Sequence, residues 1–134
     1  MYHPPIYYMD YISRSYASEH PDYLFIFGDN DQRTGYGGLA RELRGRPNAV
    51  GIRVKKKPSM TADSFYNDYE IETNQSKIDQ DMQNLRANWQ NDYARIVAPV
   101  DGIGTGRAEL KARAPKTYKF LIAKLIEHGF EYPL

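Results

Sequence analysis

The sequence predicts an α/β domain in which a mostly parallel sheet is covered by helices on both faces. Residues 23–27, 49–54 and 96–100 are short, continuous runs of apolar β-forming residues. Such runs, without polar alternation, are typical of strands buried on both faces. Helical periodicity between and after these runs gives alternating strands and helices, the pattern of a parallel sheet. The chain of 134 residues, without a linker or internal repeat, fits one domain over 1–134.

The first half of the chain begins with a predicted helix. Residues 7–18 place apolar and aromatic side chains at three- and four-residue steps, ahead of Pro21. The strand at 23–27 then ends at the turn-forming residues 28–31, and residues 39–43 form a short helix that closes near Gly45.

The second half alternates longer elements. After the strand at 49–54, the polar residues 61–73 indicate irregular structure. Residues 74–89 then repeat apolar side chains at helical steps, which predicts an amphipathic helix. The strand at 96–100 leads through a loop at 101–106 to a helix at 115–126. Pro115 stands in the first turn of that helix, and Gly129 ends it.

Composition excludes several classes of site. The chain has no cysteine, so disulfides, thiolate metal sites and cysteine nucleophiles are excluded. His3, His20 and His128 lack metal-ligand spacing, so no metal is expected, and no cofactor is implied. The net charge of +1 gives poor support to a nucleic-acid module. We expect no membrane span and no signal peptide, and hence a cytoplasmic protein.

Two glycine-rich segments follow buried strands. Gly35, Gly37 and Gly38 come after the first strand, and a second segment at 102–106 comes after the third. Ligands of open α/β sheets bind outside the carboxyl ends of strands, and glycine lets backbone N–H groups approach an anion closely. Two such loops on one sheet edge favour a phosphate-binding site over plain turns. No Gly-Lys-Ser/Thr follows either loop, so an NTPase of the P-loop type is not expected.

Each group of polar residues at the strand ends has a functional and a purely structural interpretation. Asp29, Asn30 and Asp31 could hydrogen-bond a ribose or a base edge, or simply cap a turn. One of the lysines that end the second strand, Lys55, Lys56 or Lys57, could bind a phosphate or act as a nucleophile of lowered pKa, or the three could be a solvated strand end. Asp101 could be a general base or a loop cap. The charged residues that follow it either close over a ligand or form a solvated face; they are Arg107, Glu109 and Arg113.

Three segments together resemble the macro domain family, whose fold binds ADP-ribose. They are TGYGGLARELRG at 34–45, VGIRVKKKPS at 50–59 and VAPVDGIGTGRAEL at 97–110. The similarity is nearest to the subgroup of the terminal ADP-ribose glycohydrolase and the antitoxins that remove ADP-ribose from DNA. The chain also resembles small proteins of bacteria and their phages that carry the motifs FGDN, GYGG, RGRPNAVGI and DGIGTG. The matching blocks span residues 23–126, without the extra N-terminal strands of many macro domains.

The resemblance implies a compact macro-domain-like sheet and a set of site residues. Lys55 falls near the subgroup's nucleophilic lysine, while its catalytic aspartate would fall at Ala108. Either Glu109 or Asp101 substitutes for that aspartate, or lysine-type hydrolysis is absent. The candidate catalytic residues are Asp29, Lys55, Asp101 and Glu109. The candidate ligand-binding residues are Asn30, Arg33, Gly35, Tyr36, Gly37, Gly38, Gly102, Ile103, Gly104, Thr105, Gly106 and Arg107.

Two functions follow from this resemblance. The chain is expected to bind ADP-ribose or a related nucleotide-derived ligand, and to hydrolyse ADP-ribosyl linkages on DNA or protein if the lysine is active. The alternative is a protein that sequesters a signalling nucleotide of this type without turnover, as an anti-defence protein of a phage would. The partner is then an ADP-ribose-like small molecule or an ADP-ribosylated macromolecule. The residues give no oligomeric state.

Overall fold

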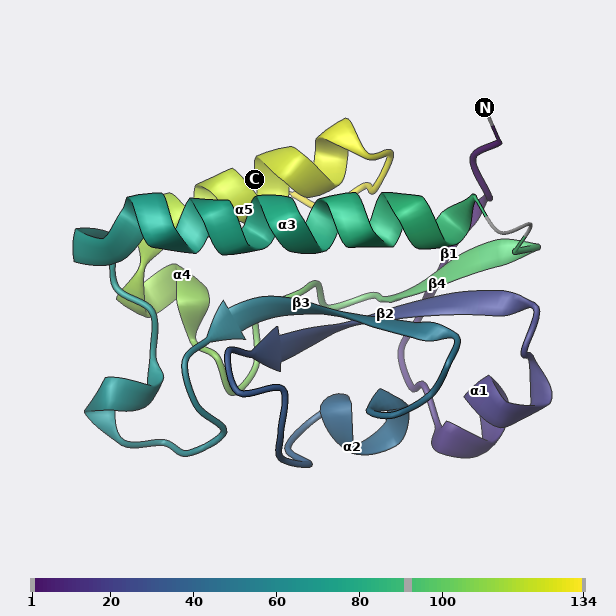
Figure 1. The fold of residues 1–134 in the computed structure, drawn as a ribbon, viewed down its shortest axis with the longest axis horizontal. Coiled ribbons are helices and arrows are strands. Elements are labelled where there is room, and N and C mark those ends of the chain that lie inside the picture. The colour runs from purple at the N-terminus through teal and green to yellow at the C-terminus, as the bar shows by residue number, and fades with distance from the viewer. Residues whose placement is uncertain (1, 91–92, 134) are drawn as a thin grey trace.

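The structure, a computed structural model, describes residues 2–90 and 93–133 and is an α/β fold with a four-stranded parallel sheet (Figure 1). The strand order is β1-β4-β2-β3, and every neighbouring pair is parallel. The elements follow one another as β1 (Ile6–Met9), α1 (Arg14–Glu19), β2 (Tyr23–Asn30), α2 (Ala40–Leu43), β3 (Ala49–Lys55), the 3-10 helices η1 (Ala62–Ser64) and η2 (Asp68–Glu70), α3 (Ile71–Trp89), β4 (Arg95–Pro99), α4 (Leu110–Arg113) and α5 (Pro115–Glu127).

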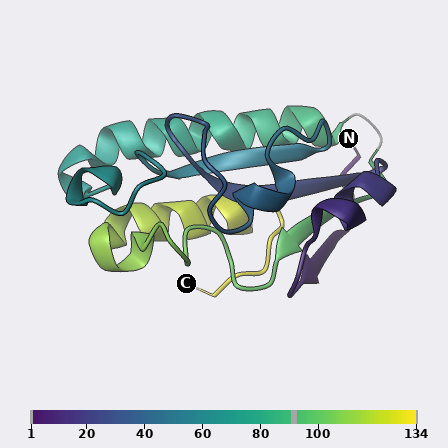
Figure 2. The same ribbon diagram turned by 90° about the horizontal axis from the view of Figure 1, so that it is seen from below.

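Helices cover both faces of the sheet, as the uninterrupted apolar strands predicted. Helices α3 and α5 lie over one face, and α1 and α2 over the other (Figures 1 and 2). Within β2, Leu24 and Ile26 join the core under α3 and α5, whereas Phe25 and Phe27 join the core above α1 and α2. Both kinds of position are at most 4% exposed, which explains why the strand lacks polar alternation.

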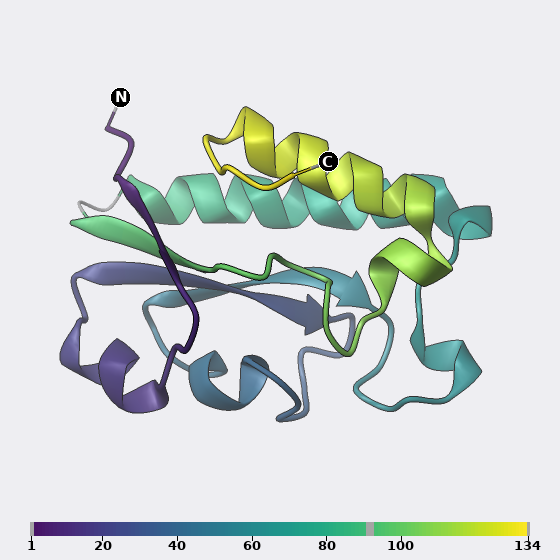
Figure 3. The same ribbon diagram turned by 180° about the vertical axis from the view of Figure 1, so that it is seen from behind.

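The prediction of a helix over residues 7–18 is wrong in its first part. Residues Ile6–Met9 form β1, which pairs with β4 from Ile6 opposite Ile96 to Met9 opposite Pro99. A strand therefore precedes β2, contrary to expectation, and it lies along the outer side of β4 (Figure 3). Pairing with a strand about ninety residues away overrides local helical periodicity. The helix itself begins at Arg14, with the Ser13 side chain accepting from the Tyr16 amide.

The prediction that residues 28–31 break the first strand is also wrong. Strand β2 continues to Asn30 because its pairing with β3 extends to Lys55, across an irregularity between Asp29 and Asn30. Residues 61–73 are more regular than predicted, since they contain η1, η2 and the first turn of α3. Helix α4 was not predicted at all.

Several predicted boundaries are confirmed. Helix α5 starts with Pro115 in its first turn, and Gly129 follows it with φ of +94°. Gly45 has φ of +83° just beyond α2. None of the described helices has the length and apolar character that a membrane span needs.

Candidate functional site

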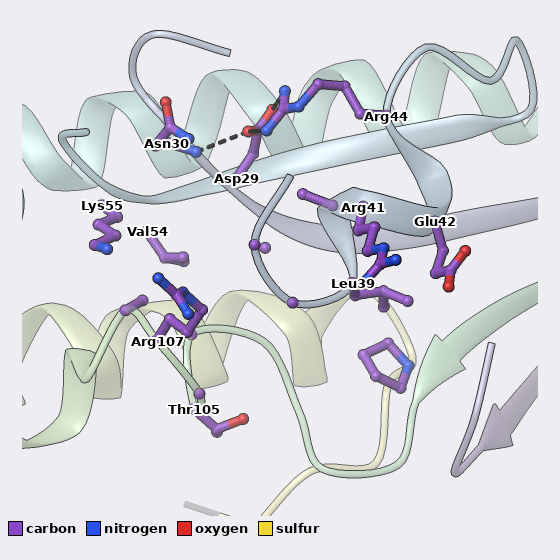
Figure 4. A pocket seen from close by; sticks show the side chains of 18 of the residues that line it. Asp29, Asn30, Leu39, Arg41, Glu42, Arg44, Val54, Lys55, Thr105 and Arg107 are labelled. Carbon is purple, nitrogen blue, oxygen red and sulfur yellow. Dashed lines mark hydrogen bonds and ion pairs between the residues drawn. The ribbon is translucent and has the colours of Figure 1, made fainter. Parts of the chain in front are cut away.

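A cleft of about 770 Å³ lies at the carboxyl edge of the sheet, and residues that follow all four strands line it (Figure 4). The chain leaves β2 toward α2 on one face, but it leaves the neighbouring β4 toward α4 and α5 on the other. Loops that diverge to opposite faces leave a crevice between them, and this is where open α/β sheets bind ligands. The volume is within the usual range for small-molecule sites.

The loop after β2 is held in shape by hydrogen bonds and one close contact. The Asn30 side-chain Nδ2 donates to the Thr34 carbonyl at 2.7 Å, and the Arg44 Nε donates to the Gly35 carbonyl at 2.7 Å. Gly35 has φ of +89°, and a Cβ there would lie 2.6 Å from Pro58. Only glycine fits this position, because both the backbone angle and the space exclude a side chain.

The loop after β4 needs glycine at two positions for structural reasons. Gly102 has φ of +94° and Gly104 has φ of +80°. A Cβ on Gly104 would also lie 3.2 Å from Leu110. Gly106 differs, since its φ is outside the left-handed region and an added Cβ would meet nothing within 4 Å.

Both loops present backbone N–H groups that the protein itself does not use. The amides of residues 35–39 and 103–108 find no hydrogen-bond acceptor among residues 2–90 and 93–133. The loops approach one another closely, because a Cβ on Gly37 would lie 2.9 Å from the Arg107 Nε. The two glycine-rich segments therefore share one cleft, and their unpaired donors suit an anion.

Three cationic side chains of the cleft have no carboxylate partner in the described part of the chain: Arg41, Lys55 and Arg107. In Figure 4, Lys55 and Arg107 extend toward the cleft from opposite sides. Asp29 also lines the cleft, but its charge is balanced by arginines. Asp10, Glu42 and Asp101 line the same cleft outside the described ion pairs, so its charges are mixed, and an anionic ligand would pair with Lys55 and Arg107.

Lys55 is 6% exposed at the end of β3. Its Nζ donates to the Ser59 carbonyl at 2.6 Å and lies 4.9 Å from the centre of the Phe65 ring. Burial lowers the pKa of Lys55, and the neighbouring positive charges of Arg107 and Arg113 lower it further. These surroundings suit an amine that binds an anion or, once neutral, attacks an electrophile.

Asp29 and Asn30 make contacts within the protein. The Asp29 carboxylate is paired with Arg44 at 2.6 Å and with Arg33 at 3.1 Å. The Asn30 side-chain oxygen accepts from the Gln32 amide at 3.0 Å, so it closes the turn after β2. Asn30 thus caps the turn after β2, as one of its two interpretations predicted. The Asp29 carboxylate oxygens are occupied by the two arginines and have little room to bind a ligand.

The structure brings most of the predicted residues to the cleft but not all. Asp101, Thr105 and Arg107 line it, in addition to the glycines of both loops. Arg33 points instead to Asp29 and Asp81, and Ile103 is 1% exposed in the core. Glu109, paired with Arg113 at 2.9 Å, is not among the lining residues.

Sequence reasoning missed the contribution of the segment after β1 and of Arg41. Asp10, Tyr11 and Ile12 line the cleft, and the Tyr11 side chain is 71% exposed. The prediction of one helix over 7–18 hid a strand end at this place. Among the described residues, no group of three or more histidine, aspartate or glutamate side chains is arranged to hold a metal ion.

Comparison with known proteins gives one match. A family model described as "Family of unknown function (DUF7831)" matches residues 7–124. No curated protein and no solved structure matches the chain.

Proposed function

The chain belongs to the DUF7831 family, whose function is unknown, and from the geometry of its cleft we propose that it binds a nucleotide-derived ligand with a diphosphate, of the ADP-ribose type. The observation that carries this proposal is the pair of glycine-rich loops facing one cleft. Their unused amides, in residues 35–39 and 103–108, are donors for the phosphate oxygens. The cations without carboxylate partners, among them Arg107, balance the two negative charges of a diphosphate.

The aromatic side chains of the cleft support a ligand that contains a base or sugar ring. Tyr11 and Tyr36 line the cleft from different loops, and each is 71% exposed. A tyrosine ring offers a flat apolar face for stacking and a hydroxyl for hydrogen bonding. Hydrogen-bond donors for a phosphate and tyrosine rings within one cleft favour a nucleotide over inorganic phosphate as the ligand.

Calorimetric titration with ADP-ribose tests the proposal. We expect saturable binding by the wild-type chain, with weaker binding of AMP and of ribose 5-phosphate, because each carries only part of the ligand. Absence of heat and of a thermal shift at millimolar ADP-ribose would refute the proposal.

The Arg107→Gln variant tests the site, with Lys111→Gln as its matched control. Lys111 is an exposed cation on α4 that does not line the cleft. Loss of a charge-assisted hydrogen bond of about 1.5–3 kcal/mol predicts roughly 10- to 150-fold weaker binding for Arg107→Gln. Equal affinities of the two variants would exclude the proposed role of Arg107.

Hydrolysis of ADP-ribosyl linkages is a second candidate function, favoured by the lowered pKa of Lys55 in the cleft wall. A neutral amine can attack the anomeric carbon and break the glycosidic bond, so that the modified base or side chain leaves and takes up a proton. Water activated by a nearby carboxylate would then cleave the bond between the lysine and the ribose, which releases ADP-ribose and restores the amine. The Asp29 carboxylate is engaged by two arginines, and Glu109 by Arg113, so of the candidate carboxylates Asp101, which lines the cleft outside the described ion pairs, is the one left to activate water. Incubation with ADP-ribosylated DNA and protein separates the two functions. Release of ADP-ribose that is lost in Lys55→Met would establish hydrolysis through this lysine.

A further inference from the structure

We propose that the buried Asp29 carboxylate is a positioning residue that acts through Arg44 to hold the glycine loop 35–38 in its binding shape. This inference rests on the proposed function, since it assigns a role in the same cleft. It replaces a chemical role for Asp29 with a mechanical one. Figure 4 shows Asp29 and Arg44 joined beside the cleft.

The Asp29 carboxylate is built into the sheet rather than presented to solvent. Its side chain is 3% exposed, and its Oδ1 accepts from the Asn30 amide at 2.8 Å. Gly51, on the neighbouring strand β3, leaves the space that this carboxylate occupies, since a Cβ there would lie 2.6 Å from the Asp29 Oδ2. A charge at this depth persists only when it is paired and hydrogen-bonded.

Arg44 connects this charge to the cleft. One end of its guanidinium donates to the Asp29 Oδ1 at 2.6 Å, while its Nε donates to the Gly35 carbonyl at 2.7 Å. The group also lies over the Phe27 ring, 5.8 Å from its centre. Because a guanidinium is planar and rigid, fixing one edge on Asp29 fixes the donor that holds Gly35.

A second buried carboxylate provides the comparison. Asp81 of α3 is 4% exposed in its side chain and is also paired with Arg33, at 2.6 Å. Its other partners are the Arg53 amide and guanidinium, at 2.7 Å and 3.0 Å. Asp81 thus holds the outer edge of β3 and does not line the cleft. The two aspartates match in burial and in pairing, but Asp29 alone is linked to Gly35.

Hydrogen exchange read by mass spectrometry, without ligand, tests the link in Asp29→Asn and Asp81→Asn. We expect at least tenfold faster exchange of the amides of residues 41–44, which donate to the carbonyls of residues 38–40, in Asp29→Asn, and a change within twofold in Asp81→Asn. Equal acceleration in both variants, or none in Asp29→Asn, would overturn the inference. If Asp29→Asn does not fold, Arg44→Lys serves in its place, because a lysine cannot hold both Asp29 and the Gly35 carbonyl.

Titration with ADP-ribose then separates this inference from the proposed function. We expect at least tenfold weaker binding by Asp29→Asn and affinity within twofold of wild type for Asp81→Asn. If wild type binds no ADP-ribose but the exchange difference is found, the proposed function fails and the positioning role stands. If wild type binds and Asp29→Asn binds equally well, the positioning role fails and the proposed function stands.

Discussion

Replacing Gly106 by alanine separates binding from folding at the loop after β4. Gly106 has neither a left-handed φ nor a neighbour within 4 Å of an added Cβ. The fold therefore tolerates alanine at position 106. Because alanine has less conformational entropy than glycine in the unfolded chain, the substitution should raise the free energy of unfolding by about 0.4–1 kcal/mol at most. If a phosphate approaches this backbone, however, the methyl group obstructs it. We expect ADP-ribose to bind at least tenfold more weakly, a loss of about 1.4 kcal/mol.

Gly104→Ala is the contrasting variant in the same loop. Its φ of +80° costs an alanine roughly 1–2 kcal/mol, and the contacts at 3.2 Å with Leu110 and 3.4 Å with Val54 add about 1–3 kcal/mol of overpacking. Together these predict a loss of roughly 2–5 kcal/mol in the free energy of unfolding. Denaturant titration without ligand and calorimetry with ADP-ribose measure the two effects. Full affinity in Gly106→Ala would refute the assignment of this loop to phosphate.

Three further predictions concern the supporting structure. The Asp68 carboxylate accepts hydrogen bonds from the amides of the first turn of α5. Desolvation raises the pKa of Asp68, but these hydrogen bonds outweigh it and leave the pKa lowered. The carboxylate therefore stabilises the fold at neutral pH, and this stabilisation is lost as the pH falls through the folded-state pKa. Asp68→Asn should cost about 0.5–2 kcal/mol at pH 7, and the difference from wild type should shrink as the pH of denaturation is lowered below the ordinary aspartate pKa of 3.8; a difference independent of pH would contradict this. Burial and the positive charge of Arg107 lower the pKa of Lys55. Arg107→Gln should therefore raise the pKa of Lys55 toward its ordinary value in an NMR titration, whereas Lys111→Gln should leave the pKa of Lys55 unchanged. Leu85→Ala, at a fully buried position on the core-facing side of α3, should cost roughly 2.7–5 kcal/mol in denaturant unfolding, and a loss below 1 kcal/mol would show that the core collapses around the smaller side chain.

The strands and helices that pack against the core were readable from local pattern. The apolar runs in β2, β3 and β4, and the periodicity of α3 and α5, follow from burial on both faces or on one stripe. Strand β1 was not readable, because its aromatic residues match helical spacing and its pairing with β4 is a contact distant in sequence. The same distance concealed the part of the cleft that follows β1.

The candidate site, like the fold, was predictable from the sequence only in part. Glycine and lysine at strand ends indicate where an anion could bind, since backbone freedom and charge are properties of the residue type. The sequence by itself determined the α/β class, the two glycine loops and the position of Lys55. The role of Asp29 was decided only in the tertiary structure, because its chemistry depends on Arg33, Arg44 and Gly51, which the fold brings around it. A carboxylate is a base or a structural anchor according to the charges and solvent around it, and those are set by packing.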